Sequence, residues 1–471
     1  MKQLLAYCLS IILCVSFTGC MENYLDLYPE DKITSASFPE NESDIKLLLN
    51  GVYAQLREKE VYNQGLFGFG ITDGATPNAF NWGTDEVFNK LGAGRLSSSD
   101  GGVVTYRWKR CYEIISRANY LLACMDLVDL SEEAKAKYSG ETHFLRGLAY
   151  SVLAETYGGV PIILTNISTE EARSLKRASL EETWQQALDD YEVAITNLGV
   201  DAPEPGRATK GAALGMKMRA YLYQGKYKEV LSCVEQIDAL KKYGLFHSYE
   251  GLFDPANENN KEVLFDIQYI EGENSQGSYI DQYCGTGTGS WTRGSRYVPT
   301  DDLVAAYETI DGSPVDPENP YENRDPRLGF TAVLPGSYFL GYRFPNYLYP
   351  GGAFNHAGNR LKHLSTRKYR IQDESKLPPS GQSYINDIIL RYADVLLSKA
   401  EAIIETNGNV ADAIAILNRI RTERDDVKIS LLPTSMSREE TREKVRHERR
   451  IELALDCLLY TSPSPRDISG S

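Results

Sequence analysis

The segment from residue 141 to residue 162 constrains the fold more than any other part of the chain. Its apolar side chains recur at three- and four-residue spacing, which places them on one broad stripe of an α-helix that must pack against other helices. The helix is predicted to end at Gly158 and Gly159, because glycine accepts the left-handed C-cap conformation and Pro161 cannot continue a hydrogen-bonded helix. The stripe consists of Phe144, Leu145, Leu148, Ala149, Val152 and Leu153.

One acidic residue, Glu155, falls on the apolar side of this helix, seven residues after Leu148. An isolated buried charge is costly, so a carboxylate in a packed layer needs a partner. We expect an ion pair with an arginine such as Arg219, and we favour it over a catalytic role for the carboxylate.

Helical periodicity covers most of the chain and predicts a mainly α protein. It recurs over residues 43–56, 105–128, 180–198 and 210–240, and again from residue 387 to residue 455. Residues 243–383 are instead rich in Gly, Pro, Asn and Tyr, with one short strand predicted at residues 263–269. We therefore expect an irregular lobe over 243–383, packed on two helical regions, 20–242 and 384–456.

Two helical segments share a spacing that indicates a repeated helix-turn-helix unit. In a tetratricopeptide repeat, glycine makes the turn between two helices, and small or aliphatic residues let the helices cross closely. Because the two units are far apart in the sequence, coincidence is the alternative. The matching residues are Gly225, Tyr227, Val230, Val234 and Ile237 in the first unit, and Gly408, Val410, Ala413, Leu417 and Ile420 in the second.

The first 19 residues have the features of an export signal. Lys2 supplies a positive charge, an apolar run from Leu4 to Val15 is too short to span a bilayer, and small residues precede Cys20. Thr-Gly-Cys resembles the end of a bacterial lipobox, although Phe17 stands where Leu is usual. We expect cleavage before Cys20 and lipidation of its thiol, with an ordinary secreted protein as the alternative.

Charge and cysteine content argue against several classes of protein. Asp and Glu total 65 against 50 for Lys and Arg, a net charge of -15, which disfavours a nucleic-acid or anionic-membrane surface. After Cys20 an odd number of cysteines remains, without a Cys-x-x-Cys pair, so neither a disulfide framework nor a zinc site is predicted. We expect no cofactor, and buried free thiols on the helical segments. The five cysteines are Cys111, Cys124, Cys233, Cys284 and Cys457.

Several short motifs, each weak alone, follow one another in a specific order over roughly residues 20 to 456. They are Pro29-Glu30-Asp31-Lys32-Ile33-Thr34, Leu49-Asn50-Gly51-Val52-Tyr53, Tyr157-Gly158-Gly159-Val160-Pro161, Gly206-Arg207-Ala208-Thr209-Lys210, Asn323-Arg324-Asp325-Pro326-Arg327-Leu328, Arg391-Tyr392-Ala393-Asp394 and His447-Glu448-Arg449-Arg450-Ile451-Glu452-Leu453. In this order they resemble the SusD/RagB family, the surface lipoproteins of glycan-uptake systems in Bacteroidetes.

The resemblance implies a tetratricopeptide-like helical bundle with an irregular, loop-rich ligand-binding lobe. It also implies a protein anchored through Cys20 at the cell surface of the outer membrane, which captures an oligosaccharide and delivers it to a SusC-like TonB-dependent transporter without cleaving it. Residues 457–471 depart from the family pattern and consist largely of turn formers. We interpret them as an anomalous tail, from a truncated gene or from the sequencing.

A sugar-binding site should combine aromatic rings, which stack on the apolar C–H face of a sugar, with polar groups that bind hydroxyls. Two glycine-rich loop segments, within residues 65–102 and 276–296, offer both. Trp82 and Trp291 fall in the regions where the family places ligand-contacting aromatics; packing within the lobe is the alternative role for each. The predicted ligand-binding residues are Asp73, Asn78, Trp82, Tyr279, Tyr283, Trp291 and Arg293, with Tyr342, Tyr347 and Tyr349 as a further candidate surface, whereas Trp108 and Trp184 are assigned to the core.

Two other functions stay open. A peptide-binding member of the same architecture would favour backbone hydrogen bonding and charged pockets over paired tryptophans. A secreted glycoside hydrolase would need two carboxylates a few ångströms apart. Because the chain has 65 acidic residues, the sequence alone does not exclude such a pair. No motif marks such a pair, and His447-Glu448 lacks the second histidine of a zinc protease.

Overall fold

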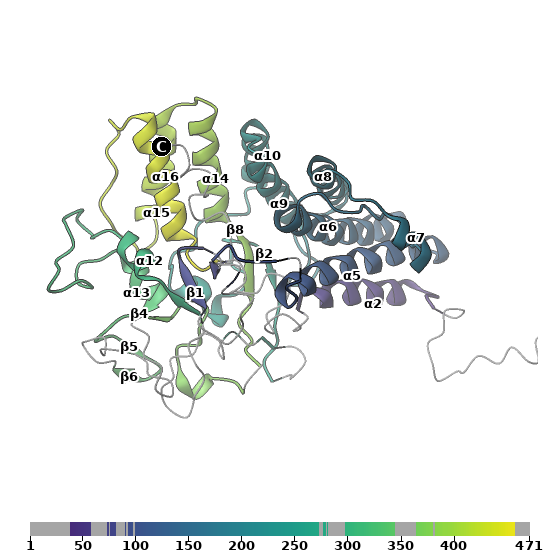
Figure 1. Cartoon of the computed structure of the whole chain (residues 1–471), viewed down its shortest axis with the longest axis horizontal. Helices are drawn as coiled ribbons and strands as arrows, with labels where there is room; N and C mark the ends of the chain where they lie inside the picture. Colours follow the sequence, from purple (N-terminus) through teal and green to yellow (C-terminus); the bar gives the residue numbers. More distant parts are fainter. Residues whose placement is uncertain are drawn as a thin grey trace, which may run out of the picture.

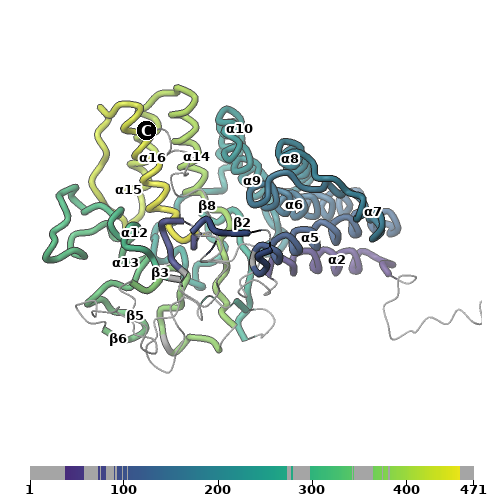
Figure 2. Tube along the Cα trace, in the orientation of Figure 1, coloured from purple at the N-terminus to yellow at the C-terminus, as the bar shows by residue number. Residues whose placement is uncertain are grey.

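The computed structural model shows a mainly α-helical protein (Figure 1). Helices from the first half of the chain lie on one side, and helices from its C-terminal part lie on the other, above an irregular lobe (Figure 2). The structure describes residues 38–57, 73–74, 76–81, 90, 93–97, 99–272, 277–278, 280, 297–343, 364–379 and 382–456.

Helix α6 is the centre of the N-terminal helical region and packs against four neighbours, α2, α5, α8 and α9. The helices of this region are α2 (Glu42–Ala54), α5 (Val103–Cys124), α6 (Glu132–Tyr157), α7 (Thr169–Ser174), α8 (Leu180–Asn197), α9 (Lys210–Tyr223) and α10 (Tyr227–Ala239). A 3-10 turn, η1 (Gln55–Arg57), extends α2.

The ends and the apolar face of α6 follow from its sequence. Ser131 caps the first turn by accepting a hydrogen bond from the backbone N–H of Ala134. The helix ends at Gly158, whose φ of 76° is the left-handed conformation that the sequence predicted. All six stripe residues are buried, which confirms the predicted face. A Cβ atom at Gly147 would lie 3.1 Å from the Cβ of Asp190, so glycine lets α6 and α8 cross closely.

Both predicted repeat units are pairs of packed helices, α9 with α10 and α14 (Tyr392–Glu405) with α15 (Val410–Thr422). Gly225 makes the first turn with a φ of 69°. In the second unit Gly408 also lies in the turn between the helices, but it is Asn407 that takes the left-handed conformation, with a φ of 58°. Asparagine tolerates this region better than most residues, and Gly408 instead accommodates Ile403, whose carbonyl oxygen would lie 3.0 Å from an added Cβ.

Short two-stranded ladders hold the lobe together. Strand β2 (Val263–Ile267) pairs antiparallel with β8 (Asp387–Arg391) and confirms the predicted strand to within two residues. Strand β1 (Ala79–Asn81) pairs antiparallel with β3 (Tyr297–Pro299). The other elements are α12 (Asp301–Ala306), α13 (Pro326–Thr331), β4 (Ala332–Val333) with β7 (Ser365–Thr366), and β5 (Tyr338–Phe339) with β6 (Tyr342–Arg343).

A network of buried ion pairs joins the lobe to the last helix, α16 (Arg438–Glu452). Arg327 of α13 contacts Glu448 at 2.6 Å and Glu452 at 2.9 Å. Arg391 of β8 lies 2.6 Å from the same Glu452. Because each charge has a partner of opposite sign, these groups can be buried without a lone charge.

The expected ion pair between Glu155 and Arg219 is wrong. Arg219 lies 2.8 Å from Asp394 of α14, which also pairs with Arg449 at 2.6 Å. Glu155 is half-buried, and burial raises its pKa although Arg107 and Arg219 favour its charged form. Helical spacing places Glu155 on the packed side but cannot show that an aspartate 175 residues after Arg219 lies closer.

The predictions for cysteines and helical tryptophans hold where the structure describes them. Cys111, Cys124 and Cys233 are buried free thiols, whereas Cys284 and Cys457 lie outside the described residues. Trp184 is buried, and Trp108 packs partly buried against the same core.

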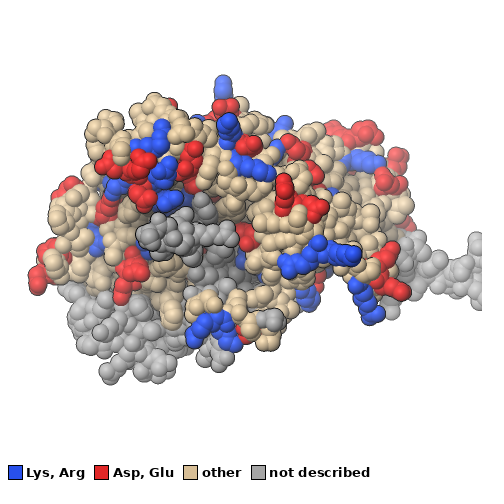
Figure 3. Space-filling model, turned by 45° about the horizontal axis from the view of Figure 1, so that its top comes forward, with Lys and Arg blue, Asp and Glu red and all other residues tan. Residues whose placement is uncertain are grey.

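The surface carries charges of both signs. On the face shown in Figure 3, lysine and arginine side chains are interspersed with aspartate and glutamate side chains over the helices. Among the helices that the structure describes, none combines the length and the apolar character needed to cross a membrane.

Candidate functional site

The β1–β3 ladder brings the two predicted binding segments together. In its antiparallel register Ala79 faces Pro299 and Asn81 faces Tyr297, so the chain leaves β1 at the same end at which it enters β3. Trp82 follows Asn81 directly, and Trp291 lies six residues before Tyr297. The segment that contains Trp82 therefore leaves the ladder at the same end at which the segment that contains Trp291, about 200 residues later, enters it.

Hydrogen bonds fix the first of these segments where it enters β1. The backbone N–H of Thr300 donates to the carbonyl of Asn78 at 3.0 Å, and the Thr300 hydroxyl donates to the carbonyl of Pro77. On the other side Arg450 of α16 donates from Nε to the side-chain oxygen of Asn78 at 2.7 Å. Strand β1 consequently lies beside elements from the end of the chain, as Figure 1 shows.

The structure places Asp73 and Asn78 in the interior, where each is 0 % exposed. The Asp73 carbonyl accepts hydrogen bonds from the N–H and the hydroxyl of Thr76, and the Thr76 hydroxyl accepts the N–H of Asn78 at 3.1 Å. Both predicted contact residues thus order the segment that leads into β1, and neither side chain reaches the surface.

The remaining predicted contact residues lie outside the described part of the chain, so their roles stay predictions. They are Trp82, Tyr279, Tyr283, Trp291 and Arg293, together with Tyr347, Tyr349 and the side chain of Tyr342.

An aromatic side chain that the sequence reading missed lies in β1 itself. Phe80 is 43 % exposed although it pairs in register with Val298, which is 3 % exposed. Residues that pair across a ladder share one face of the sheet, so the Phe80 ring extends beyond the part of this face that covers Val298. Phe80 was missed because its segment was read as a loop without periodicity.

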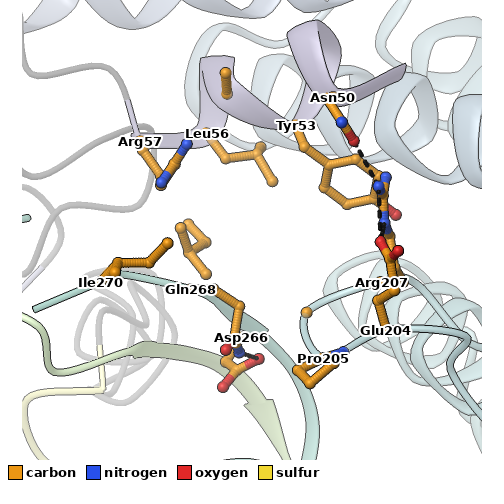
Figure 4. Close-up of a pocket in the computed structure, with 13 residues that line it drawn as sticks. Asn50, Tyr53, Leu56, Arg57, Glu204, Pro205, Arg207, Asp266, Gln268 and Ile270 are labelled. Atoms are coloured by element: carbon orange, nitrogen blue, oxygen red, sulfur yellow. Dashed lines mark hydrogen bonds and ion pairs between the residues drawn. The ribbon is translucent and has the colours of Figure 1, made fainter. Parts of the chain in front are cut away.

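A polar pocket of about 390 Å³ is lined by Arg57 and Ile270, which precede the two predicted loops in the sequence (Figure 4). One wall is the end of α2 and η1, up to Arg57, after which the chain continues towards Asp73. The facing wall follows β2 and ends at Ile270, shortly before the second loop. The lining side chains labelled in Figure 4 are Asn50, Tyr53, Leu56, Arg57, Glu204, Pro205, Arg207, Asp266, Gln268 and Ile270.

Two of the motifs described above meet in one wall of this pocket. The Tyr53 hydroxyl donates to Glu141 at 2.8 Å and accepts the backbone N–H of Ala208 at 3.0 Å. The guanidinium of Arg207 lies over the Tyr53 ring, 4.9 Å from its centroid, and donates to Asn50 at 2.5 Å. Burial raises the pKa of Tyr53 well above its usual range, so this hydroxyl keeps its proton and the wall is firmly ordered.

The facing wall offers an amide and an apolar side chain. Gln268 donates to the carboxylate of Asp266 at 2.6 Å and to the amide oxygen of Asn259 at 3.1 Å, which fixes its orientation. Ile270 is 55 % exposed. A second hollow of about 470 Å³ shares residues 204–207 and Asp266 with the pocket, and a third of about 660 Å³ shares Ile270.

Three carboxyl groups surround Asn386 at the end of the β2–β8 ladder. Asn386 donates from its backbone to Glu258 at 2.9 Å and from its side chain to Asp266 at 3.1 Å, and the Tyr269 hydroxyl donates to Asp387 at 3.1 Å. Burial raises the pKa of Glu258 to about 7, of Asp266 to about 6 and of Asp387 to about 7. These bonds order the strand ends behind the pocket.

Neither predicted loop contributes a metal site in the part of the chain that the structure describes. No three His, Cys, Asp or Glu side chains converge there in a way that would hold an ion. The described residues form a polar pocket between α2 and β2, and the aromatic ring of Phe80 is exposed on the β1–β3 ladder.

Two family models match successive parts of the chain. One, described as "Starch-binding associating with outer membrane", matches residues 23–222, and the other, described as "SusD family", matches residues 261–457. The chain belongs to the SusD/RagB family.

Relatives and solved structures of the SusD family match almost the whole chain. A SusD-like protein from Bacteroides fragilis has a TM-score of 0.78 and 26 % identity, covering 92 % of this chain and 88 % of that one. A SusD-like carbohydrate-binding protein from the same organism has a TM-score of 0.77 and 27 % identity, covering 89 % and 85 %. SusD-like protein P25 of Formosa agariphila is 25 % identical over 97 % of this chain and 88 % of the relative.

A laminarin-binding SusD-like protein shares the fold at 20 % identity, with a TM-score of 0.69 and coverage of 89 % of this chain and 90 % of that one. Together these structures confirm the predicted fold class, a tetratricopeptide-like helical protein with a loop-rich lobe.

Proposed function

We propose that this SusD-family protein captures an oligosaccharide at the surface of the outer membrane and delivers it, uncleaved, to a SusC-like TonB-dependent transporter. The β1–β3 ladder carries the proposal, because it joins the origins of two loops that hold tryptophan, tyrosine, asparagine and arginine. Such a combination suits a sugar, which presents an apolar face and hydroxyl groups on one molecule.

The ligand would contact both loops at once. Trp82 and Trp291 are the proposed stacking platforms, with Tyr279, Tyr283 and Arg293 beside them, and the exposed ring of Phe80 extends the surface from β1. Asp73 and Asn78 would act beneath this surface as supports, since both are buried.

The pocket between α2 and β2 would receive a further sugar unit. Its volume of about 390 Å³ lies within the range of small-molecule sites. The amides of Asn50 and Gln268 and the guanidinium of Arg57 supply hydrogen-bonding groups, while Ile270 supplies an apolar contact. This division of polar and apolar groups matches the two faces of a sugar ring.

Two observations support the proposed location at the outer membrane. The family description names association with the outer membrane, and the chain carries a lipobox-like Thr-Gly-Cys ending at Cys20. A lipid on Cys20 would hold the protein beside a transporter without a membrane-spanning helix.

Affinity gel electrophoresis tests the proposal. Protein without its first twenty residues would be run through gels containing starch, laminarin and a panel of plant, microbial and host polysaccharides. We expect one glycan to retard it, and Trp82→Ala, Trp291→Ala and Gln268→Ala to reduce the retardation. Tyr120→Ala, which removes a 40 % exposed ring on α5, is the control that should leave it unchanged.

The same samples separate the other functions. Chain length and reducing ends of the retarding glycan should stay constant during incubation, whereas shortening would indicate a hydrolase. If no polysaccharide retards the folded protein, and a peptide from a library binds it saturably, glycan capture would be overturned in favour of a peptide ligand.

A further inference from the structure

Arg450 of α16, which is partly buried, differs from the fully buried arginines around it. Arg449 pairs with Asp394 at 2.6 Å, and Arg327 and Arg391 each contact Glu452. Arg450 has no carboxylate within ion-pair distance among the described residues, and its Nη2 atom is buried without a hydrogen-bond acceptor.

The charged form of Arg450 is therefore disfavoured by its surroundings. Burial lowers its pKa, and the nearby groups Asp302 and Tyr307 offset only part of that effect. A buried charge without a counter-charge contributes little or nothing to stability. The hydrogen bond that Arg450 does make, 2.7 Å from Nε to the Asn78 amide oxygen, joins positions 372 residues apart.

Asn78 is the point at which that bond can control the loops. It directly precedes β1 and is 0 % exposed, and its carbonyl accepts the N–H of Thr300, the residue after β3. The Thr300 hydroxyl also donates to the carbonyl of Pro77 and caps α12 by accepting the backbone N–H of Leu303. A displacement of Asn78 would therefore shift both strands of the ladder.

Helix α16, which carries Arg450, is held in place by buried ion pairs. Glu448 and Glu452, which lie two residues before and two residues after Arg450, both form ion pairs with Arg327 of the lobe. A residue between these anchors cannot shift without breaking buried ion pairs, so the Nε of Arg450 is a fixed donor for the asparagine.

We infer that Arg450 is a positioning residue for the ligand-binding loops: through Asn78 it sets the register and orientation of the β1–β3 ladder from which both loops start. The inference rests on the proposed function for its consequence, glycan affinity, but its physical content, the fixing of the ladder by α16, is independent of any ligand.

The test uses the full chain in detergent, as wild type, Arg450→Gln, Arg450→Lys and Arg446→Gln. Arg446 lies one turn earlier on α16 and is 41 % exposed in its pair with Glu443, so its variant is the matched control. Backbone hydrogen exchange is measured at Ala79–Asn81 and at Tyr297–Thr300, and thermal unfolding reports global stability.

Arg450→Gln should speed exchange in the ladder about ten-fold, the size expected for losing a hydrogen bond from a charged donor. Global stability should stay unchanged or rise, because a partly buried charge without a counter-charge is removed. Arg450→Lys, which keeps the charge but not the Nε geometry, should behave like Arg450→Gln, and Arg446→Gln like the wild type.

A double-mutant cycle identifies the partner. If Arg450 acts through Asn78, Arg450→Gln and Asn78→Ala together should speed ladder exchange no more than either alone. Unchanged exchange in Arg450→Gln, or faster exchange throughout the protein with a matching loss of stability, would overturn the inference in favour of a merely structural residue.

Starch and laminarin retention, measured on the same variants, connects the ladder to the ligand. A wild type that binds either one should lose about ten-fold in affinity in Arg450→Gln; faster ladder exchange with unchanged affinity would refute the role in binding. If the wild type binds neither, glycan capture fails for these sugars, while the exchange result still decides the role of Arg450.

Discussion

Glu452 of α16 and Arg391 of β8 form an ion pair of 2.6 Å in which both side chains are buried, 0 % and 2 % exposed. Arg327 and Arg424 reach the same carboxylate at 2.9 Å and 2.8 Å. One acidic side chain thus contacts three buried guanidinium groups and connects the lobe to the C-terminal helices.

The variant Glu452→Gln should therefore destabilise the protein strongly. Removing one partner of a buried pair leaves uncompensated charge and costs about 3 to 5 kcal/mol. Denaturant unfolding followed by circular dichroism measures the loss. Arg446→Gln, which breaks the exposed pair with Glu443 on the same helix, should cost less than about 1 kcal/mol, and equal losses in the two variants would contradict this account of the network.

Acid should weaken the helical core through Asp394. Although burial opposes its ionisation, the guanidinium groups of Arg219 and Arg449 hold the pKa of Asp394 at about 2, below the usual 3.8. A carboxylate with a depressed pKa contributes stability above pH 3.8 that is lost as the pH falls towards 2. Unfolding curves between pH 5 and pH 2 should show this loss, and Asp394→Asn should be less stable at pH 6 while losing less on acidification.

Asp387 should have the opposite pH dependence. Burial raises its pKa from 3.8 to about 7, so the folded state binds the proton more tightly and stability falls as the pH rises through this window. Asp387→Asn keeps an acceptor for the Tyr269 hydroxyl but cannot ionise. Its melting temperature should exceed that of the wild type at pH 8 and match it near pH 4; equal melting temperatures at both values would show that the carboxyl is not shifted.

Gly206 should prove necessary for the pocket. Its φ of 78° disfavours any side chain, and a Cβ atom there would lie 2.3 Å from the Cγ of Gln268. Gly206→Ala should cost about 1 kcal/mol in backbone strain and also displace Gln268 from the pocket wall. Gly225→Ala, with a φ of 69° and no neighbour closer than 4.0 Å, carries the strain alone, so only Gly206→Ala should weaken glycan retention.

Local patterns predicted the helices because each carries its own signal. The apolar stripe on α6 follows from three- and four-residue spacing of its side chains. The end of α6 and the turn between α9 and α10 follow from single turn residues, Gly158 and Gly225. The motif that contains Tyr53 and the one that contains Arg207 could be recognised separately, yet only the folded chain shows that they form one pocket wall.

Long-range partners could not be predicted from such patterns. Arg219 pairs with Asp394 because α9 packs against α14, and nothing near either residue in the sequence reveals that contact. In the same way the local sequence around Asn78 favoured a ligand contact, whereas in the structure Asn78 is buried and accepts a hydrogen bond from Arg450 near the far end of the chain. Side-chain type predicted that Asp73 and Asn78 contact a ligand, whereas the structure shows that both are buried.

Isothermal titration calorimetry with Trp82→Ala, Trp291→Ala and the double variant tests the central claim most directly, namely that two loops joined by the β1–β3 ladder bind one glycan. The titrant is the polysaccharide that retards the wild type in gels. Each single variant should lose about ten-fold or more in affinity, and the double variant should be little weaker than either, because the two rings grip one ligand. Unchanged affinity in both single variants, with melting temperatures equal to that of the wild type, would contradict the account and place the glycan elsewhere on the molecule.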